Sequence, residues 1–247
     1  MKPPIVRGVI RRRILVNFRV EPRVMQQQLP ALFRPKLVGG VALAGICLVR
    51  VEQLRPFPVP AALGLSSDNA AHRVAVEWDG DEGAPREGVY IPRRDSSSLG
   101  THLMGGRLFP GLQQRADFNV VDDEHGIQVS MRSRDGQVSI ALRAHAATSL
   151  PPRSCFGSLA DASDFFAAGS LGYSATNDPA RLDGLRLVTR GWHIEPLAVD
   201  EAHSSFFADP GRFPPGSVEL DSALLMRDVE HEWHPAGSMC VPSTMGW

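Results

Sequence analysis

The apolar positions of the chain fall mainly into short runs bounded by Gly, Pro and Asp, a pattern typical of strands. Two such runs lie near the N-terminus, "RILVNFRV" (13–20) and "VALAGICLVRVEQL" (41–54), and the proline cluster "RPFPVP" stops the second. The segment "GVYIPRRD" (88–95) predicts another strand. The first part of the chain is therefore predicted to be mainly strand.

Strict alternation marks one strand in particular. "HRVAVEW" (72–78) places Val74 and Val76 on one face and Arg73 and Glu77 on the other. The apolar face is predicted to be buried, and the second face is predicted to be polar or to line a cavity.

From Arg115 the pattern becomes a meander, in which the segments "RADFNVV", "IQVSMRS" and "QVSIALRAHAA" are separated by "DDEHG" and "RDG". These turns supply the Asp and Gly that hairpins need, so at least three consecutive antiparallel strands are predicted. Two further long strands are predicted at "LRLVTRGWHIEPLAV" (185–199) and "SVELDSALLMRDVEHEW" (217–233).

Helical signals are few. A short helix is predicted in "EPRVMQQQLPALF" (21–33), and a second in "SLADASDFFAAG" (158–169), where Ser158 is a suitable N-cap. The predicted fold class is therefore mainly β (α+β), an antiparallel β-barrel or sandwich with a few peripheral helices. No repeat or low-complexity tract interrupts the chain, and residues 1–247 are expected to form a single domain.

Charge and composition narrow the range of partners. The 247 residues include 26 Lys and Arg against 27 Asp and Glu, so nothing attracts the chain generally to nucleic acid or to an anionic membrane. No segment approaches the roughly 18 apolar residues of a membrane span, and the N-terminal segment lacks the apolar run of a signal peptide. Cys47, Cys155 and Cys240 show neither metal-knuckle spacing nor a disulfide framework. A cytoplasmic location is expected.

Four spaced segments carry a resemblance to a known group: "RRRILVNFRVEPRVMQQQLP", "GVYIPRRDSSS", "GGRLFPG" and "GYSATNDPARLDG". In this order they resemble the YqjF-like domain-of-unknown-function family, within the acetoacetate decarboxylase-like superfamily. The resemblance covers most of the chain, from about Arg12 to Pro235. It implies a β-barrel or cone-shaped antiparallel sheet that encloses a small-molecule cavity.

The resemblance also implies a catalytic difference. In acetoacetate decarboxylase a lysine of a Tyr-Pro-Lys-Lys turn forms a Schiff base with the substrate ketone. The best matching turn here is Phe109-Pro110-Gly111-Leu112, in which Gly111 and Leu112 stand in place of the lysine pair. Neither remaining lysine, Lys2 or Lys36, is expected to reach a cavity. Schiff-base decarboxylation is therefore expected to be lost, and no cofactor is expected.

Three residues are candidates for catalysis. Arg107, just before the altered turn, could clamp a substrate carboxylate or enolate through two parallel hydrogen bonds, or could form a structural ion pair. Glu77 and Tyr90 lie on neighbouring predicted strands, where they could form an acid/base pair. The alternative for Glu77 is a surface position on the polar face of its strand.

Three further residues are candidates for substrate binding. Tyr173 and Thr176 in "GYSATNDP" could orient a ligand by hydrogen bonds, or this loop could simply cap a turn. Arg94 in "RRDSSS" could lie at the edge of the site, or could be one of several solvated charges at a strand end. The triplet "RRR" (11–13) is predicted to be an exposed strand start.

No metal site is predicted. His231 and His234 lie three residues apart, and on a strand they point to opposite faces. His193 is the one further imidazole considered, and no spacing supports it as a ligand. The chain also has no phosphate-binding Gly-rich loop with Lys-Ser/Thr and no G-x-S-x-G turn.

Two hypotheses for function remain open. The first is a cofactor-free lyase, isomerase or cyclase-like enzyme that acts on a small carbonyl- or carboxylate-bearing compound in the barrel. The second is a non-catalytic module that binds an apolar or carboxylate-bearing metabolite in the same cavity. A small-molecule ligand is the expected partner in both, and a homodimer through an exposed edge strand is possible.

Overall fold

The computed structural model describes residues 4–80, 83–98 and 111–242 of the chain. Its strands, in chain order, are β1 (Val6–Val20), β2 (Arg34–Pro35), β3 (Leu37–Val38), β4 (Val41–Pro56), β5 (Leu65–Asp79), β6 (Pro85–Ser96), β7 (Gln113–Asp123), β8 (Gly126–Ser133), β9 (Ser139–Ala146), β10 (Leu171–Ala175), β11 (Arg181–Arg190), β12 (Glu195–Ser204) and β13 (Val218–Cys240). The helical segments are α1 (Pro22–Gln27), the 3-10 helix η1 (Ala61–Leu63) and α3 (Leu159–Ala168).

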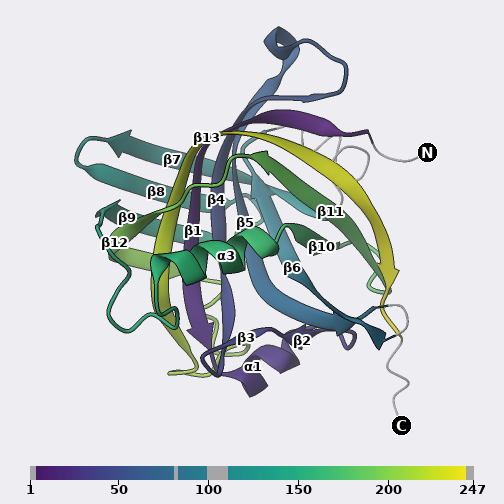
Figure 1. Cartoon of the computed structure of the whole chain (residues 1–247), viewed down its shortest axis with the longest axis vertical. Coiled ribbons are helices and arrows are strands. Elements are labelled where there is room, and N and C mark those ends of the chain that lie inside the picture. The colour runs from purple at the N-terminus through teal and green to yellow at the C-terminus, as the bar shows by residue number, and fades with distance from the viewer. Residues whose placement is uncertain (1–3, 81–82, 99–110, 243–247) are drawn as a thin grey trace.

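All these strands belong to one sheet, in the order β11-β10-β6-β7-β8-β9-β12-β13-β1-β4-β5-β2, with β3 beside β4. Additional pairings of β5 with β6 and of β11 with β13 close the sheet into two rings (Figure 1). Both rings contain β13, β1, β4, β5 and β6, which we call the shared wall. One ring is completed by β10 and β11, and the other by β7, β8, β9 and β12.

The predicted mainly β fold with a few peripheral helices is confirmed, with two refinements. The closure differs from that of one regular barrel, because β6 and β13 each change partner along their length. In addition, β6 runs parallel to both β7 and β10, so the sheet is mixed rather than wholly antiparallel.

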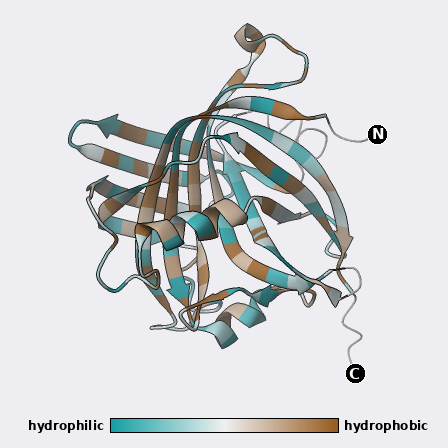
Figure 2. Cartoon of the chain, viewed as in Figure 1, coloured by the Kyte–Doolittle hydropathy of each residue, from teal (hydrophilic) through white to brown (hydrophobic). Residues whose placement is uncertain are grey.

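The shared wall is buried on both faces, which explains the nearly continuous apolar runs in its sequence. In β1, Ile14 and Val16 pack into a first core together with β8 and β9, whereas Ile10 and Leu15 pack into a second core beneath α3. Side chains alternate between the faces of a strand, so one apolar segment supplies both cores. Apolar residues are accordingly concentrated on the central strands (Figure 2).

The helix α3 crosses the second-core face of the shared wall (Figure 1). As predicted, Ser158 caps its N-terminus, where the hydroxyl accepts a hydrogen bond of 3.1 Å from the Asp161 amide. Phe166 on the inner side of α3 is buried in the second core. The predicted helix over residues 21–33 is shorter than expected, because α1 ends at Gln27.

One predicted strand is wrong in extent. The segment 185–199 contains the end of β11 at Arg190 and the start of β12 at Glu195. Gly191 lies between them with a φ of +86°, a left-handed conformation that glycine adopts without a Cβ clash. The two halves therefore join different parts of β13. Among the described residues, no helix has the length and apolar character needed to cross a membrane.

Candidate functional site: an arginine-lined cavity

A cavity of about 140 Å³ lies on the second-core side of the shared wall. This volume suits a small molecule, because a cavity of about 150 Å³ can hold benzene. Its polar lining includes Arg13, Cys47, Asn69, Arg73 and Arg94, and its apolar lining includes Val51, Leu54, Leu185, Leu187 and Trp233. The cavity therefore has both a cationic and an apolar part.

Strand register brings the polar residues together. Cys47 of β4 pairs with Ala71 of β5, and Ala71 pairs with Arg94 of β6, so these residues form one row across three strands. The small side chain of Ala71 leaves room between its larger neighbours. Arg73 lies two residues further along β5, on the face opposite to Val74.

Within the described residues, the hydrogen bonds and ring contacts of Arg13 and Arg73 are with neutral groups. The Arg13 Nε donates to Cys47 Sγ over 3.4 Å, and its guanidinium lies 5.8 Å from the Trp192 ring. Arg73 donates to the side-chain oxygen of Asn17 and lies 4.9 Å from the ring of Phe166 on α3. One buried nitrogen of each guanidinium, Nη1 of Arg13 and Nε of Arg73, has no hydrogen-bond partner.

The third arginine contacts a serine of β10 that packs against Gly111. Arg94 donates through Nε and Nη2 to the Ser174 hydroxyl of β10, over 3.1 and 3.0 Å. Gly111 packs directly against the same serine, with a φ of +93°, and a Cβ added there would lie 2.4 Å from Ser174 Cβ. A lysine at position 111 would therefore require a shift of β10.

The three arginines carry charge that the described part of the chain does not neutralise. None of Arg13, Arg73 and Arg94 forms an ion pair with a described carboxylate. Asp95 also lines the cavity, but its carboxylate pairs with Arg93 over 2.8 Å. Burial lowers the pKa of Arg73 and of Arg94 to about 10, so both guanidinium groups stay protonated at neutral pH. A buried cation without a counter-ion is costly, and a bound anion would offset this cost.

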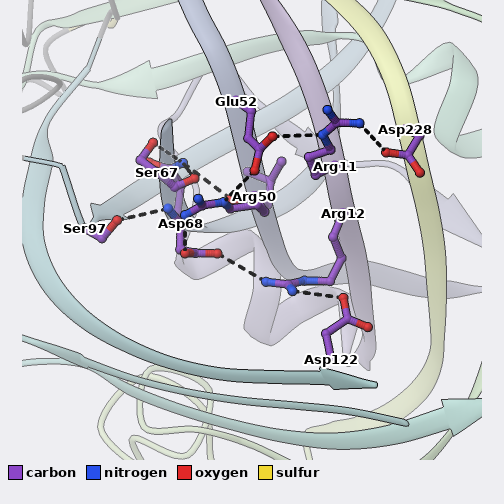
Figure 3. A network of polar contacts seen from close by, with 11 residues as sticks. Arg11, Arg12, Arg50, Glu52, Ser67, Asp68, Ser97, Asp122 and Asp228 are labelled. Atoms are coloured by element: carbon purple, nitrogen blue, oxygen red, sulfur yellow. Dashed lines mark hydrogen bonds and ion pairs between the residues drawn. The ribbon is translucent and has the colours of Figure 1, made fainter. Parts of the chain in front are cut away.

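A second group of arginines on the shared wall is neutralised by carboxylates (Figure 3). Arg12 lies between Asp68 and Asp122, with N to O distances of 3.2 and 3.1 Å. Arg50 also pairs with Asp68 over 2.9 Å, and Arg227 pairs with Asp122 over 2.6 Å. We call these five residues the ion-pair network. It ties β1, β4, β5, β7 and β13 together.

The structure does not bring Glu77 and Tyr90 together. Glu77 follows Arg73 and Ala75 on one face of β5, and its half-exposed carboxylate lies 3.6 Å from the Arg34 guanidinium. Tyr90 points into the first core, where burial raises its pKa. Their action as an acid/base pair stays a prediction, without support from this geometry.

Tyr173 and Tyr90 do lie side by side, because β10 and β6 pair in parallel at these two residues. Both rings pack around Phe33 in the first core, away from the arginine-lined cavity. Burial also raises the pKa of Tyr173. Neither tyrosine lines the cavity.

Of the other predicted site residues, Arg94 lines the cavity and Thr176 caps a turn. Arg94 lines the cavity, as its assignment to substrate binding requires. The Thr176 hydroxyl is engaged in its own loop, where it donates to backbone oxygens of Asp178 and Arg181 and accepts from the Asp178 amide. This is the turn-capping alternative. Arg107 lies outside the described residues.

Sequence reasoning missed Arg13 and Cys47. The triplet "RRR" (11–13) was predicted to be an exposed strand start, but it lies in the middle of β1. Arg11 is exposed as predicted, whereas Arg12 is buried and Arg13 lines the cavity. The signal for Arg73 was its place on the polar face of an otherwise apolar strand. No comparable signal marks Cys47, which lies in a continuous apolar run.

The lysine expected to stay away from any cavity lies close to this one. Lys36 lines a small pocket of about 30 Å³ that adjoins the arginine-lined cavity and shares Arg13 and Arg73 with it. Its Nζ lies 2.5 Å from the Glu87 carboxylate and 4.7 Å from the Phe165 ring. The ammonium group is thus already paired. Lys2 lies outside the described residues.

His231 and His234 lie on β13, where residues three apart point to opposite faces, as predicted. His231 is buried, and burial lowers its pKa to about 4. His234 instead contacts Glu232 over 2.8 Å, and the largely exposed His193 lies 3.7 Å from Glu195. Within the described residues, no three His, Cys, Asp or Glu side chains are grouped so that they could hold a metal ion.

Comparisons with known proteins agree with this fold. The model of the family DUF2071, described as an uncharacterized conserved protein, matches residues 9–222. No curated protein matches the chain.

Several solved structures share the fold at low identity. An acetoacetate decarboxylase from Legionella pneumophila is 12% identical with a TM-score of 0.60, covering 99% of this chain and 90% of that one. The enduracididine biosynthesis enzyme MppR complexed with pyruvate is 13% identical with a TM-score of 0.54, covering 98% and 91%. An acetoacetate decarboxylase-like enzyme from Sphingomonas wittichii is 12% identical with a TM-score of 0.53, covering 98% and 94%.

Proposed function

The chain belongs to the DUF2071 family, and we propose that it binds a small organic acid in the arginine-lined cavity. The observation that carries this proposal is the presence of three arginines in one cavity without a described carboxylate partner. Guanidinium groups bind carboxylates through charge-assisted hydrogen bonds. Arg94, with Arg13 and Arg73, is the expected anion clamp.

The lining also favours a particular shape of ligand. Along β4 the cavity residues change from Cys47 beside the arginines to Val51 and Leu54 further along the strand. A carboxylate at the arginine end would place a short apolar tail against these residues and Leu185. The ligand class is therefore a small amphipathic acid. The pyruvate in the MppR structure is a small acid bound to a protein of the same fold, which is consistent with this class.

Isothermal titration calorimetry tests the proposal with paired ligands. We expect saturable binding of acids such as butyrate and pyruvate, and no binding of butyramide, which has similar size without the charge. Arg94→Met is expected to weaken acid binding by about 10- to 100-fold, because one charge-assisted interaction contributes about 1.5–3 kcal/mol.

Arg190→Met is the matched control, because Arg190 is 80% exposed on β11. It should leave the affinity unchanged. Equal binding of the acid and the amide, or full affinity in Arg94→Met, would contradict the proposal.

Two forms of this function remain, an enzyme that turns the acid over and a module that only binds it. In either form we propose that Schiff-base chemistry is lost, since Gly111 occupies the lysine turn and Lys36 is paired with Glu87. Borohydride trapping with acetoacetate, followed by intact mass measurement, should yield no adduct. An adduct on Lys36 would contradict the proposed loss of Schiff-base chemistry.

A separate measurement distinguishes the enzyme from the binding module. Mass spectrometry should detect a product of the bound acid only if the protein is an enzyme.

A further inference from the structure

The cavity contains one nucleophilic side chain that anion binding alone does not use. Cys47 is partly buried on β4 and lines the cavity. The Arg13 Nε donates to its Sγ over 3.4 Å, and Arg73 and Arg94 line the same cavity. The thiol thus shares one cavity with all three arginines of the proposed clamp.

We propose that Cys47 adds reversibly to the carbonyl carbon of a 2-oxo acid held by these arginines. This inference rests on the proposed function and narrows its ligand class. Cys47 and Arg94 lie two strand spacings apart, about 10 Å between their Cα atoms, with the small Ala71 between them. A carboxylate bound by the arginines that line this cavity would hold the carbonyl bonded directly to it in the same cavity as Sγ.

Arg13 is placed to assist the addition. Its Nε contacts Sγ, while its buried Nη1 has no hydrogen-bond partner. When a nucleophile adds to a carbonyl, negative charge develops on the oxygen, and a preorganised donor stabilises it. The unused Nη1 belongs to the same planar group that contacts the sulfur, so it is a suitable donor to that oxygen.

The step balances without any further reactant. The sulfur lone pair forms a bond to carbon 2 of the oxo acid, and the C=O π electrons move to the oxygen. The thiol proton ends on that oxygen, which gives a hemithioketal. Nothing leaves and nothing is oxidised, so the reverse step releases the intact acid.

The other two cysteines serve as internal comparisons, since neither lines the cavity. Burial, together with the nearby Asp221 carboxylate, raises the pKa of Cys155 to about 12, so its thiol stays protonated. Cys240 is exposed at the end of β13. Cys240 therefore reports the reactivity of a solvated thiol in the same molecule.

Carbon-13 NMR of the full chain with pyruvate labelled at carbon 2 tests the inference. Wild type should convert part of the ketone signal into a hemithioketal signal, Cys47→Ser should abolish that signal, and Cys240→Ser should leave it unchanged. Identical spectra for wild type and Cys47→Ser, with butyrate binding retained, would overturn the inference and leave the proposed function intact. Failure of wild type to bind any acid would overturn both.

Alkylation rates give a second, independent measurement. Iodoacetate carries a carboxylate and iodoacetamide does not, so the clamp should favour the former at Cys47. We expect the iodoacetate-to-iodoacetamide rate ratio to be at least about tenfold higher at Cys47 than at Cys240, and to fall toward the Cys240 value in Arg94→Met. Equal ratios at the two cysteines would contradict guidance of the electrophile by the arginines.

Discussion

Two groups of arginines on the shared wall of this protein have opposite electrostatic surroundings. In the ion-pair network, Arg12 lies between Asp68 and Asp122 (Figure 3). In the cavity, its sequence neighbour Arg13 contacts a thiol and an aromatic ring. On β5, Asp68 belongs to the network, whereas Arg73 belongs to the cavity. The chain thus holds compensated and uncompensated cations within a few residues of each other.

This difference in carboxylate partners distinguishes an arginine that stabilises the fold from one that is available to bind a ligand. A guanidinium that already has its carboxylates contributes to the fold, because removing one partner leaves the other buried and unpaired. A buried guanidinium that has only neutral partners contributes little to the fold and keeps its charge for a ligand. The number of arginines alone does not distinguish these cases, since both groups contain three.

The largest effect is expected when the free energy of unfolding is compared between a variant of the ion-pair network and a variant of the cavity. Asp122→Ala removes the carboxylate shared by Arg12 and Arg227 and should lower the free energy of unfolding by about 2 kcal/mol, less than for a fully buried pair because the Asp122 side chain is 21% exposed. Arg94→Met should leave the unliganded protein within about 1 kcal/mol of wild type, or more stable. Urea unfolding at neutral pH measures both.

If Arg94→Met were less stable than Asp122→Ala, the distinction between stabilising and binding arginines would be wrong. Binding supplies the cross-check, since Asp122→Ala should retain acid affinity whereas Arg94→Met should not.

A smaller effect is expected on the acid side. Hydrogen bonds from Arg227 and Arg12 hold the pKa of the Asp122 carboxyl below its ordinary 3.8. Its stabilising contribution is therefore complete above pH 3.8 and is lost as the pH falls through the lower, folded-state pKa. The stability difference between wild type and Asp122→Asn should narrow over that range.

His72 also titrates in acid, since burial lowers its pKa from 6.5 to about 3, but it is present in both proteins and its effect cancels in the difference. A difference that stays constant down to pH 2 would show that the network does not act through this carboxylate.

The smallest effect is expected at Arg11, an exposed arginine beside the ion-pair network. Arg11 pairs with Glu52 over 2.9 Å and with Asp228 over 3.0 Å, yet its side chain is 45% exposed. Exposed pairs contribute little, because water and salt screen them. Arg11→Ala should leave the thermal midpoint unchanged within the error of calorimetry. A clear drop in the thermal midpoint would mean that the exposed Arg11 pairs and the ion-pair network stabilise the protein cooperatively.

Much of the fold was predictable from local pattern. The alternation in "HRVAVEW" predicted the two faces of β5, and Ser158 predicted the start of α3. The meander of β7, β8 and β9 followed from its Asp- and Gly-containing turns. These features depend on residues close in sequence, so the sequence carries their signal directly.

The site was less predictable, because its members come from strands distant in sequence. Arg94 was identified through its motif. Glu77 and Tyr90 were paired because their predicted strands are neighbours, and Tyr173 was proposed from a segment rich in hydroxyl groups. The pleat directs both tyrosines into the other core. Cys47 gave no signal, since a cysteine in an apolar run resembles any other core residue.

By itself the sequence determined most of the long strands and the positions of the two α-helices. Only the tertiary structure decided which arginines keep their charge unpaired. An arginine's partner depends on which face of its strand it occupies and on which strand the sheet places opposite. In this chain the two partners can be far apart in sequence, as Arg12 and Asp122 are at 110 residues. Local composition cannot encode that pairing, because closure of the sheet into two rings creates it.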